Sequence, residues 1–369
     1  MSNDTSHMAR AIELAQRGLY STMPNPRVGC VLVRDGVVIG EGWHVRAGEG
    51  HAEVNALANA KERGEQVAGS TAYVTLEPCS HTGRTGPCCD ALAEAGITRL
   101  VFGMQDPNPQ VAGSGLARMA AAGIEITGPV LETQARALNP GFIRRMETGL
   151  PLVRCKLAMS VDGRTAMASG ESQWITGPAA RGDVQRLRAR SCAIVTGIGS
   201  IVLDDSSLTV REAELGLGED TPLAMEKQPL RVVLDSQQRM ALDAKVLREA
   251  STTLVVSARE PSAELASLGL TQWQLPDATG RIDLKLLLQR LAEQQCNEVL
   301  VEAGATLAGA FVAAGLVDEL IIYMAPTLMG NQARGLLDLP IETMADKRPL
   351  KIIDIRAVGD DWRITAQAL

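Results

Sequence analysis

The sequence predicts an α/β protein built from two successive domains. The chain has 369 residues, which is long enough for two domains of common size. Hydrophobic residues make up 46% and charged residues 21%, so each half has enough apolar side chains for its own core. Helix-like and strand-like segments alternate along both halves, which is typical of a sheet layered between helices.

In the first half, residues 8–18 carry apolar side chains at helical spacing, and Gly18 is a suitable helix end. Strands are expected at 27–33 and 37–40, joined by the hairpin pair Asp35-Gly36. The remaining elements expected here are helices at 51–63, 87–95, 114–122 and 131–147 and strands at 71–76 and 99–104. We place the domain boundary in the Thr-Gly-Leu-Pro segment that follows, giving domains 1–148 and 149–369.

The second half repeats the alternation without an internal sequence repeat. The expected strands are 152–158, 192–196, 231–235, 253–257, 298–301 and 319–324, with helices at 178–190, 283–294 and 306–314. Residues 351–356 and 362–366 are expected to form a terminal hairpin around Gly359. Residues 211–229 are polar, contain several Gly and Pro, and are expected to form a surface loop.

Charge and composition argue against several classes of partner. The formal net charge is -7, whereas broad contact with a nucleic-acid backbone needs an excess of positive charge. No apolar run approaches the length that spans a membrane, and residues 1–10 lack the apolar segment of a secretion signal. Seven cysteines in a chain that needs no disulfide staples indicate reduced thiols in a cytoplasmic protein.

The first quarter of the chain contains a group of residues typical of a catalytic zinc site. All four histidines precede residue 82, so a histidine-based metal site can exist only there. His51 and Glu53 open an expected helix, Cys79 follows an expected strand, and Cys88 opens the next helix. Zinc deaminases hold the metal with one His and two Cys, while a Glu two residues after the His moves protons. Three protein ligands leave the fourth tetrahedral position for water.

This pattern predicts deamination of a small pyrimidine-type ring. Zinc lowers the pKa of its bound water toward about 7, so hydroxide is available near neutrality to attack the amine-bearing carbon. Glu53 is expected to take the proton from the water and to deliver protons to the ring nitrogen and the leaving ammonia.

The cysteine spacing leaves the choice of ligands open. Zinc deaminases commonly space their cysteines as P-C-x-x-C, but Cys79 and Cys88 lie nine positions apart. His81 and Cys89 compete as ligands on spacing alone. We favour Cys88 because it directly follows Pro87 at a helix start, where the helix dipole favours a thiolate. The alternatives are a structural zinc site, which usually has four protein ligands, and buried free thiols.

Three further residues lie near this group in the sequence. Asn25, in a Pro-Asn-Pro segment, either hydrogen-bonds a substrate or is a simple turn residue. His44 either faces the pocket or caps a loop. Arg84 lies between two glycines, where a solvated side chain and a phosphate contact are both consistent with its neighbours.

Segments along nearly the whole chain resemble one known family. They are HAEVNA at 51–56, TLEPCSHTGRTGPCC at 75–89, QDPNPQVAG at 105–113, KLAMSVDGR at 156–164, GESQWIT at 170–176, LDD at 203–205 and VEAG at 301–304. The family is the bifunctional riboflavin biosynthesis protein, a diaminohydroxyphosphoribosylaminopyrimidine deaminase fused to a 5-amino-6-(5-phosphoribosylamino)uracil reductase. The long cysteine spacing is itself a feature of this family.

The resemblance implies a cytidine-deaminase-like α/β/α domain followed by a dihydrofolate-reductase-like α/β domain that uses NADPH. It assigns the zinc ligands to His51, Cys79 and Cys88 and the proton-transferring acid to Glu53. The positions that match substrate contacts in the reductase are Ser172, Arg188, Arg211 and Glu302. The positions that match NADPH contacts are Ala158, Trp174, Ser200, Asp204, Ser236 and the run Gly304, Ala305, Thr306, Leu307, Ala308, Gly309 and Ala310. The resemblance also implies a homo-oligomer. One departure is Ser206, where the family pattern leads us to expect proline.

Without the resemblance, the second half is less informative. It contains no complete Gly-rich dinucleotide motif, and Gly304 before an expected helix is either a phosphate seat or an ordinary turn. Trp174 either stacks on a cofactor or fills the core. Guanidinium geometry suits phosphate, so Arg188 and Arg211 are candidate phosphate clamps, with surface ion pairing as the alternative. Lys156, Asp204 and Glu302 are the polar candidates for orienting the sugar or moving a proton.

Two other functions fit parts of this pattern. A deaminase of nucleic acids or free nucleosides would use the same zinc site, but it leaves the acidic balance and the long second half unexplained. A non-catalytic module with a structural zinc would have no need for Glu53. We therefore expect a two-activity enzyme that acts on a phosphoribosylated pyrimidine, first by deamination and then by reduction of the ribosyl group to ribityl.

Overall fold

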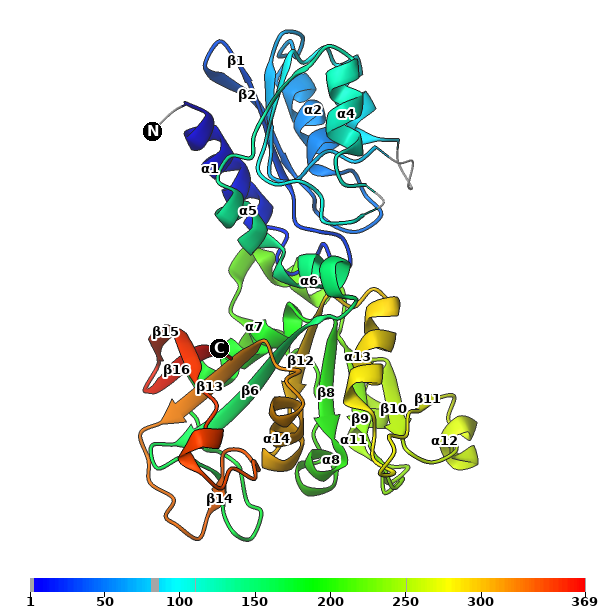
Figure 1. Cartoon of the computed structure of the whole chain (residues 1–369), viewed down its shortest axis with the longest axis vertical. Coiled ribbons are helices and arrows are strands. Elements are labelled where there is room, and N and C mark those ends of the chain that lie inside the picture. Colours follow the sequence, from blue (N-terminus) through cyan, green and yellow to red (C-terminus); the bar gives the residue numbers. More distant parts are fainter. Residues whose placement is uncertain (1–2, 81–85, 110, 250, 369) are drawn as a thin grey trace. The chain divides into compact units, whose positions relative to one another are not determined.

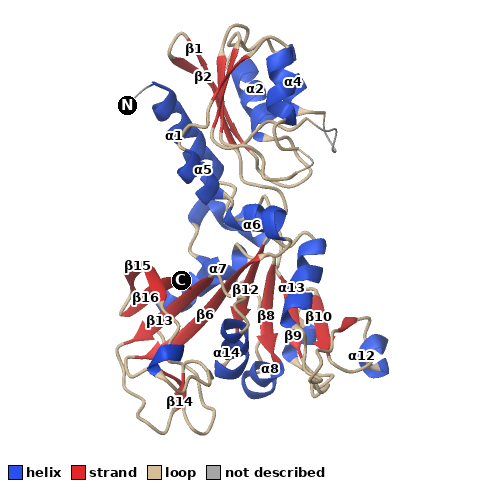
Figure 2. Ribbon diagram, in the orientation of Figure 1, coloured by secondary structure: helices blue, strands red, loops and turns tan. Residues whose placement is uncertain are grey.

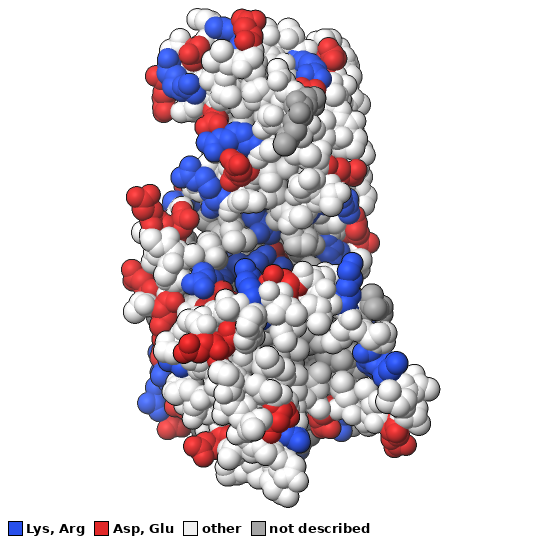
Figure 3. Space-filling view, turned by 90° about the vertical axis from the view of Figure 1, so that its left-hand side faces the viewer, with Lys and Arg blue, Asp and Glu red and all other residues white. Residues whose placement is uncertain are grey.

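The structure is a computed structural model that describes residues 3–80, 86–109, 111–249 and 251–368. The chain divides into two compact units, Met1–Gly149 and Leu150–Leu369. Each unit is an α/β assembly around its own sheet, as Figures 1 and 2 show. Among the described residues, no helix is both long enough and apolar enough to cross a bilayer. On the face shown in Figure 3, acidic and basic side chains are interspersed.

Unit 1 has a five-stranded sheet in the order β2-β1-β3-β4-β5. Strand β1 is antiparallel to β2 and β3, whereas β3, β4 and β5 are mutually parallel. The strands are β1 (Gly29–Arg34), β2 (Val37–Trp43), β3 (Thr71–Val74), β4 (Arg99–Phe102) and β5 (Glu125–Thr127). The helices are α1 (Asn3–Gln16), α2 (Ala52–Glu62), α3 (Cys88–Glu94), α4 (Ser114–Ala121), α5 (Glu132–Leu138) and α6 (Pro140–Thr148).

Helices cover both faces of this sheet, which gives the expected three-layer arrangement. Helices α1 and α5 pack on one face, where Met8 and Leu138 meet Val31 and Val101. Helices α2, α3 and α4 pack on the other face around Leu32 and Leu100. Helix α2 lies very close to β2, because a Cβ on Gly42 would stand 2.3 Å from the backbone nitrogen of Ala56. Glycine at this position therefore sets the depth at which α2 sits.

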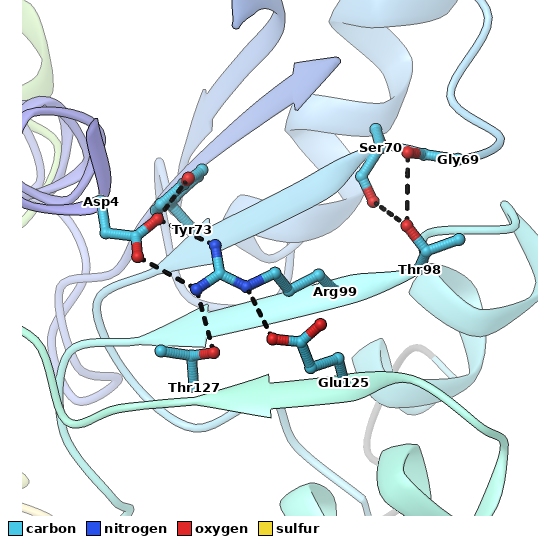
Figure 4. Close-up of polar contacts among 8 residues, drawn as sticks. All are labelled: Asp4, Gly69, Ser70, Tyr73, Thr98, Arg99, Glu125 and Thr127. Atoms are coloured by element: carbon cyan, nitrogen blue, oxygen red, sulfur yellow. Dashed lines mark hydrogen bonds and ion pairs between the residues drawn. The ribbon is translucent and has the colours of Figure 1, made fainter. Parts of the chain in front are cut away.

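The first turn of α1 is attached to the sheet by a polar network, shown in Figure 4. Arg99 on β4 donates to both carboxylate oxygens of Asp4, at 2.9 and 3.0 Å. The hydroxyl of Tyr73 on β3 also donates to Asp4, at 2.8 Å. Arg99 further donates to Thr127 and Glu125 on β5, so one guanidinium connects α1 to two neighbouring strands.

For the first unit, the sequence analysis was wrong about one helix and missed one strand. The single helix predicted at 131–147 is two helices, α5 and α6, separated at Asn139. Pro140 causes the break, because proline lacks an N–H and disfavours helical backbone in the residue before it. Asn139 then uses its side chain to accept from the Arg27 backbone N–H at 2.7 Å and to donate to the Arg27 carbonyl. The three-residue strand β5 was not predicted, because it is too short to show alternation.

Unit 2 has a nine-stranded sheet in the order β11-β10-β9-β8-β12-β6-β13-β16-β15. The first seven strands of this order are parallel, and the terminal hairpin β15–β16 adds two antiparallel strands. The strands are β6 (Leu152–Ser160), β8 (Ala193–Gly197), β9 (Leu230–Leu234), β10 (Thr253–Ser257), β11 (Thr271–Gln274), β12 (Glu298–Glu302), β13 (Glu319–Ala325), β15 (Leu350–Val358) and β16 (Asp361–Ala368). A separate pair is formed by β7 (Arg164–Ala166) and β14 (Arg334–Gly335).

Helices cover both faces of this second sheet as well. Leu287, Leu291 and Phe311 pack on one face, and Leu187 and Ile198 on the other. The helices are α7 (Pro178–Ala189), α8 (Ile198–Asp204), α9 (Glu212–Leu215), α10 (Thr221–Met225), α11 (Lys245–Arg248), α12 (Ala263–Ser267), α13 (Leu284–Glu293) and α14 (Ala305–Ala313), with short 3-10 turns η1 (Gly218–Asp220) and η2 (Met344–Asp346).

The surface loop predicted at 211–229 was also wrong in detail. This segment contains the short helices α9 and α10 and the turn η1. Leu215 is fully buried and Ala224 is 1% exposed, so apolar anchors hold a segment whose composition is mostly polar. Arg186 on α7 also donates to the carbonyl of Leu215 at 3.3 Å.

Candidate functional site

Three predicted ligands meet in unit 1. One ligand atom each from His51, Cys79 and Cys88 lies within 4.8 Å of the others. The Nδ1 atom of His51 is 3.3 Å from the sulfur of Cys88 and 3.6 Å from the sulfur of Cys79. His51 caps the start of α2, Cys79 follows the end of β3, and Cys88 is the first residue of α3. One nitrogen and two sulfur donors at these separations fit tetrahedral zinc with one open position.

The structure distinguishes the two neighbouring cysteines. Cys88 faces His51 and Cys79, whereas Cys89 packs in the core of unit 1 and its thiol donates to Asp90 at 3.7 Å. Successive helical residues differ by about 100° in direction, so adjacent cysteines cannot both face the site. His81 and Arg84 lie outside the described residues.

The surroundings of Cys79 favour the deprotonated form of its thiol. Its pKa is lowered to about 4, first by a hydrogen bond from the thiol of Cys88 and then by one from His51, although burial opposes the shift. The backbone N–H of Cys88, at the start of α3, also donates to the Cys79 sulfur at 3.3 Å. The remaining proton of the pair therefore stays on Cys88, whose pKa is raised mainly by that hydrogen bond. Thiolates are the form that binds metals.

Glu53 lies beside the ligand group. It is the second residue of α2 and is 3% exposed. Burial raises its pKa to about 7, and the neighbouring Cys79 charge acts in the same direction. A carboxyl group with a pKa near neutrality can both accept and release a proton, which is the property that the predicted role requires.

Asn25 and His44 lie beside the same group. The amide nitrogen of Asn25 is 3.1 Å from Nε2 of His44, and the ring of His44 meets the ring of His51 edge to face at 5.2 Å. Burial lowers the pKa of His44, so the neutral ring is favoured. Its Nδ1 then donates to the carbonyl of Gly50 at 3.0 Å, and its Nε2 accepts from Asn25.

Glu77 is a site residue that the sequence analysis missed. Its buried carboxylate accepts four backbone N–H groups, from Asp106 at 3.2 Å, Gly113 at 2.9 Å, Gly115 at 2.9 Å and Leu116 at 3.3 Å. It thereby connects Asp106 and residues 113–116 to the segment that ends in Cys79. Gly115 approaches so closely that a Cβ there would stand 2.0 Å from the carbonyl oxygen of Pro78. Two residues of the QDPNPQVAG motif, Asp106 and Gly113, therefore contact the carboxylate that lies two positions before Cys79.

In unit 2, the predicted residues gather at the carboxyl ends of parallel strands. Lys156 and Ala158 lie on β6, Glu302 ends β12, and Ser200 lies on α8 directly after β8. Ser236 follows β9, and residues 304–310 form the start of α14. In open parallel sheets, ligands bind at this edge. The first N–H groups of α14 lack partners within the helix, which suits a phosphate group.

Lys156, Arg188, Arg211 and Glu302 form one charge cluster. Arg188 on α7 donates to both carboxylate oxygens of Glu302, at 2.6 and 2.9 Å. Burial lowers the pKa of Lys156, while the charge of Glu302 opposes that shift. Arg211 pairs with Glu214 at 2.7 Å and acts electrostatically on Glu302. The Arg188 guanidinium is thus already bound to a carboxylate in a buried ion pair. Arg211 also forms an ion pair, but its side chain is more exposed.

Two other predicted residues are joined directly. The hydroxyl of Ser172, a predicted substrate contact, donates at 3.2 Å to Asp204, a predicted cofactor contact.

Trp174 is 68% exposed, so it does not fill the core. The guanidinium of Arg181 stacks on its ring, 4.7 Å from the centroid. One face of the exposed Trp174 ring is therefore covered by the Arg181 cation.

Comparison with known proteins assigns both units. Residues 1–104 match the cytidine and deoxycytidylate deaminase zinc-binding region, and residues 151–364 match the RibD C-terminal domain. The riboflavin biosynthesis protein RibD of Escherichia coli is 52% identical over 363 residues, covering 97% of each chain. The Haemophilus influenzae protein of the same name is 48% identical, covering 99% of this chain and 97% of its own.

Solved structures of full-length relatives agree with this assignment. Acinetobacter baumannii RibD is 48% identical with a TM-score of 0.91, over 100% of this chain and 99% of its own. A Thermotoga maritima diaminohydroxyphosphoribosylaminopyrimidine deaminase/5-amino-6-(5-phosphoribosylamino)uracil reductase is 30% identical with a TM-score of 0.86 over the same shares. The chain therefore belongs to the RibD family of bifunctional deaminase–reductases of riboflavin biosynthesis.

Proposed function

We propose that residues 1–148 deaminate 2,5-diamino-6-(5-phosphoribosylamino)pyrimidin-4(3H)-one and that residues 149–369 reduce the ribosyl group of the resulting uracil to ribityl. The observation that carries the deaminase half is the meeting of His51, Cys79 and Cys88 beside the buried carboxyl group of Glu53. The name of the Thermotoga maritima relative supports the choice of substrate.

In the deaminase, His51, Cys79 and Cys88 would hold zinc, which supplies a Lewis acid that acidifies water. Glu53 takes the proton of the attacking water and passes protons to the ring nitrogen and then to the departing ammonia. Its buried position beside the three ligands suits both transfers. Asn25 donates to the ring substrate, and His44 orients Asn25 through their hydrogen bond.

In the reductase, NADPH supplies the hydride that reduces C1 of the opened sugar. Residues 304–310 and Ser236 would hold its phosphate groups, and Trp174, Ala158, Ser200 and Asp204 would contact the rest of the cofactor. Ser172, Arg211 and Glu302 bind the substrate, while Arg188 orients Glu302. Lys156, beside Glu302, supplies the proton, because its lowered pKa makes release easier.

We further propose that the protein works in the cytoplasm as a homo-oligomer without a nucleic-acid partner. The cytoplasm keeps thiols reduced, which the two cysteine ligands require. Strand β15 supports self-association: it is an edge strand whose Ile352, Ile353 and Ile355 are 55%, 45% and 53% exposed. Sedimentation of the wild type and of Ile353→Lys tests the proposed self-association. If both proteins sediment as monomers, the homo-oligomer is contradicted.

The function is tested by supplying the diaminopyrimidine substrate to purified protein and following ammonia release and NADPH oxidation separately. Both signals are expected, and a zinc chelator is expected to stop ammonia release while sparing reduction of the preformed uracil. Ammonia without NADPH oxidation would contradict the reductase assignment. Neither signal from zinc-loaded protein would contradict both halves of the proposal.

A further inference from the structure

Two cysteines of unit 2 lie next to each other at the amino edge of its sheet. Cys192 directly precedes β8, and Cys296 lies two residues before β12. These strands are parallel neighbours, with Val299 opposite Ala193. The strands therefore bring together the segments just before them, which hold two cysteines that are 104 positions apart in the sequence.

Hydrogen bonds hold Cys192 beside the segment that contains Cys296. The backbone N–H of Cys192 donates to the carbonyl of Glu298 at 2.8 Å, and the backbone N–H of Asn297 donates to the Cys192 sulfur at 3.2 Å. The Cys192 sulfur also shares a hydrogen bond with the thiol of Cys296. Neither cysteine is in a disulfide.

The pair differs from the other cysteines outside the zinc site. The Cys296 hydrogen bond is the main cause that lowers the pKa of Cys192 to about 7, against the effect of burial. Burial raises the pKa values of Cys30, Cys89 and Cys155, which are at most 1% exposed. Cys192 is half-buried as a residue, whereas Cys296 is 7% exposed, so Cys192 has the larger exposed surface of the two. Thiolate character and access together determine cysteine reactivity.

We propose that Cys192 and Cys296 form a redox-active dithiol that low-molecular-weight disulfides convert into an intramolecular disulfide bond. The thiolate of Cys192 attacks one sulfur of the small disulfide, which forms a mixed disulfide and expels one thiolate. Cys296 loses its proton and attacks the Cys192 sulfur, which expels the second small thiolate. The protein loses two electrons and two protons, and the small disulfide becomes two thiols.

The position of this bond predicts what oxidation does. The carboxyl ends of β8 and β12 lead to Ser200 and Glu302, whereas the two cysteines lie at the amino ends of the same strands. A bond there joins two neighbouring strands without reaching the edge that carries the reductase residues. Cross-linking across a long loop restricts the unfolded chain more than the folded one, so the oxidised protein is expected to unfold at a higher temperature.

The test treats the zinc-loaded full chain with oxidised glutathione, blocks remaining thiols by alkylation and maps peptides without reduction. A cross-linked peptide joining Cys192 and Cys296 is expected, and dithiothreitol should abolish it while the zinc content stays constant. The proposal is overturned if Cys192 is recovered only alkylated or only as its glutathione adduct. It is equally overturned if the cross-link joins other cysteines.

Two single variants separate the roles of the thiols. Cys296→Ala is expected to stop at the glutathione adduct of Cys192, because the second thiol is missing. Cys192→Ala is expected to leave Cys296 alkylated and free of glutathione, because the thiol that first attacks the small disulfide is missing. The reverse pattern would contradict the assigned order of attack. Both variants are also compared for unfolding temperature with and without oxidant, and neither should show the increase expected for the wild type.

Discussion

Arg188 and Glu302 are joined by two parallel hydrogen bonds, of 2.6 Å from Nε and 2.9 Å from Nη2. Both side chains are about 10% exposed, at 11% and 10%. Burial alone would raise the pKa of Glu302, but the charge and hydrogen bonds of Arg188 outweigh it and lower that pKa. Glu302 is therefore an anion held in one orientation at the end of β12, next to Lys156.

Glu302→Gln is expected to reduce reductase kcat/KM by about tenfold or more, because the neutral amide cannot form the two charge-assisted bonds to Arg188. Removing one partner of a buried ion pair also destabilises a protein by roughly 3–5 kcal/mol, so unit 2 should unfold earlier. Ammonia release should stay at the wild-type level. The exposed Glu264→Gln is the control, and equal loss of both activities in Glu302→Gln would contradict a role confined to the reductase.

Glu53→Gln is expected to reduce ammonia release by about 100-fold or more, because the amide cannot accept a proton. The three ligands are untouched, so zinc content by atomic absorption should remain at one ion per chain. Reduction of preformed uracil substrate should also persist. Glu62→Gln, on the exposed side of the same helix, is the matched control. Full deaminase activity in the Glu53 variant would eliminate the proposed proton route.

Glu77→Gln is expected to weaken zinc binding by roughly tenfold, since residues that orient metal ligands commonly have effects of this size. The amide keeps one acceptor oxygen, but its NH2 group would oppose backbone N–H donors that the carboxylate now accepts. Competition with a chromophoric chelator measures the affinity. Glu94→Gln, an exposed change on α3, should bind zinc as the wild type does; identical affinities for both variants would mean that Glu77 does not position Cys79.

Asp4 predicts a pH dependence of stability in unit 1. The hydrogen bonds from Arg99, first, and from Tyr73 lower the pKa of Asp4 below its ordinary value of 3.8, although burial opposes them. A lowered folded-state pKa stabilises the fold above the unfolded-state pKa, and that stability is lost as the pH falls through the folded-state pKa. Asp4→Asn should therefore cost about 1 kcal/mol at pH 7, a modest value because both partners are partly exposed.

The cost of Asp4→Asn should begin to shrink as the pH falls below about 4, where Asp4 of the unfolded chain binds a proton, and should be lost once the pH is below the lowered folded-state pKa. Urea unfolding at several pH values measures the difference in the free energy of unfolding. Asp35→Asn, at a 93% exposed side chain, is the control and should change stability little at any pH. A cost for Asp4→Asn that is the same at pH 3 and pH 7 would mean that the charge of Asp4 contributes nothing.

The zinc group could be predicted from sequence because its residues lie at the ends of consecutive elements. His51 and Glu53 share the first turn of α2, Cys79 follows β3, and Cys88 begins α3. The choice between Cys88 and Cys89 stayed open because residue spacing does not specify which way each side chain faces on the helix. The packing of α3 against the core specifies it. Pro140, by contrast, was visible in the sequence and sufficient to predict the break between α5 and α6.

The features that escaped prediction depend on contacts between distant residues. Arg188 and Glu302 are 114 positions apart, and their pairing follows from the packing of α7 on the face of the sheet that contains β12. Glu77 was missed for a different reason, because all four of its partners are backbone N–H groups, which leave no side-chain pattern to recognise. The resemblance could name residues at both sites, but it could not say which of them touch.

The edge-to-face contact between His44 and His51 also provides a magnetic probe of the first unit. Ring currents shift proton resonances of an aromatic group held 5.2 Å away, so the imidazole signals of His44 should move when His51 is fixed by a metal. Every histidine of the chain precedes residue 82. A plain proton NMR spectrum of the 39.2 kDa chain would therefore report metal loading through its histidine signals, because unit 2 contains no histidine.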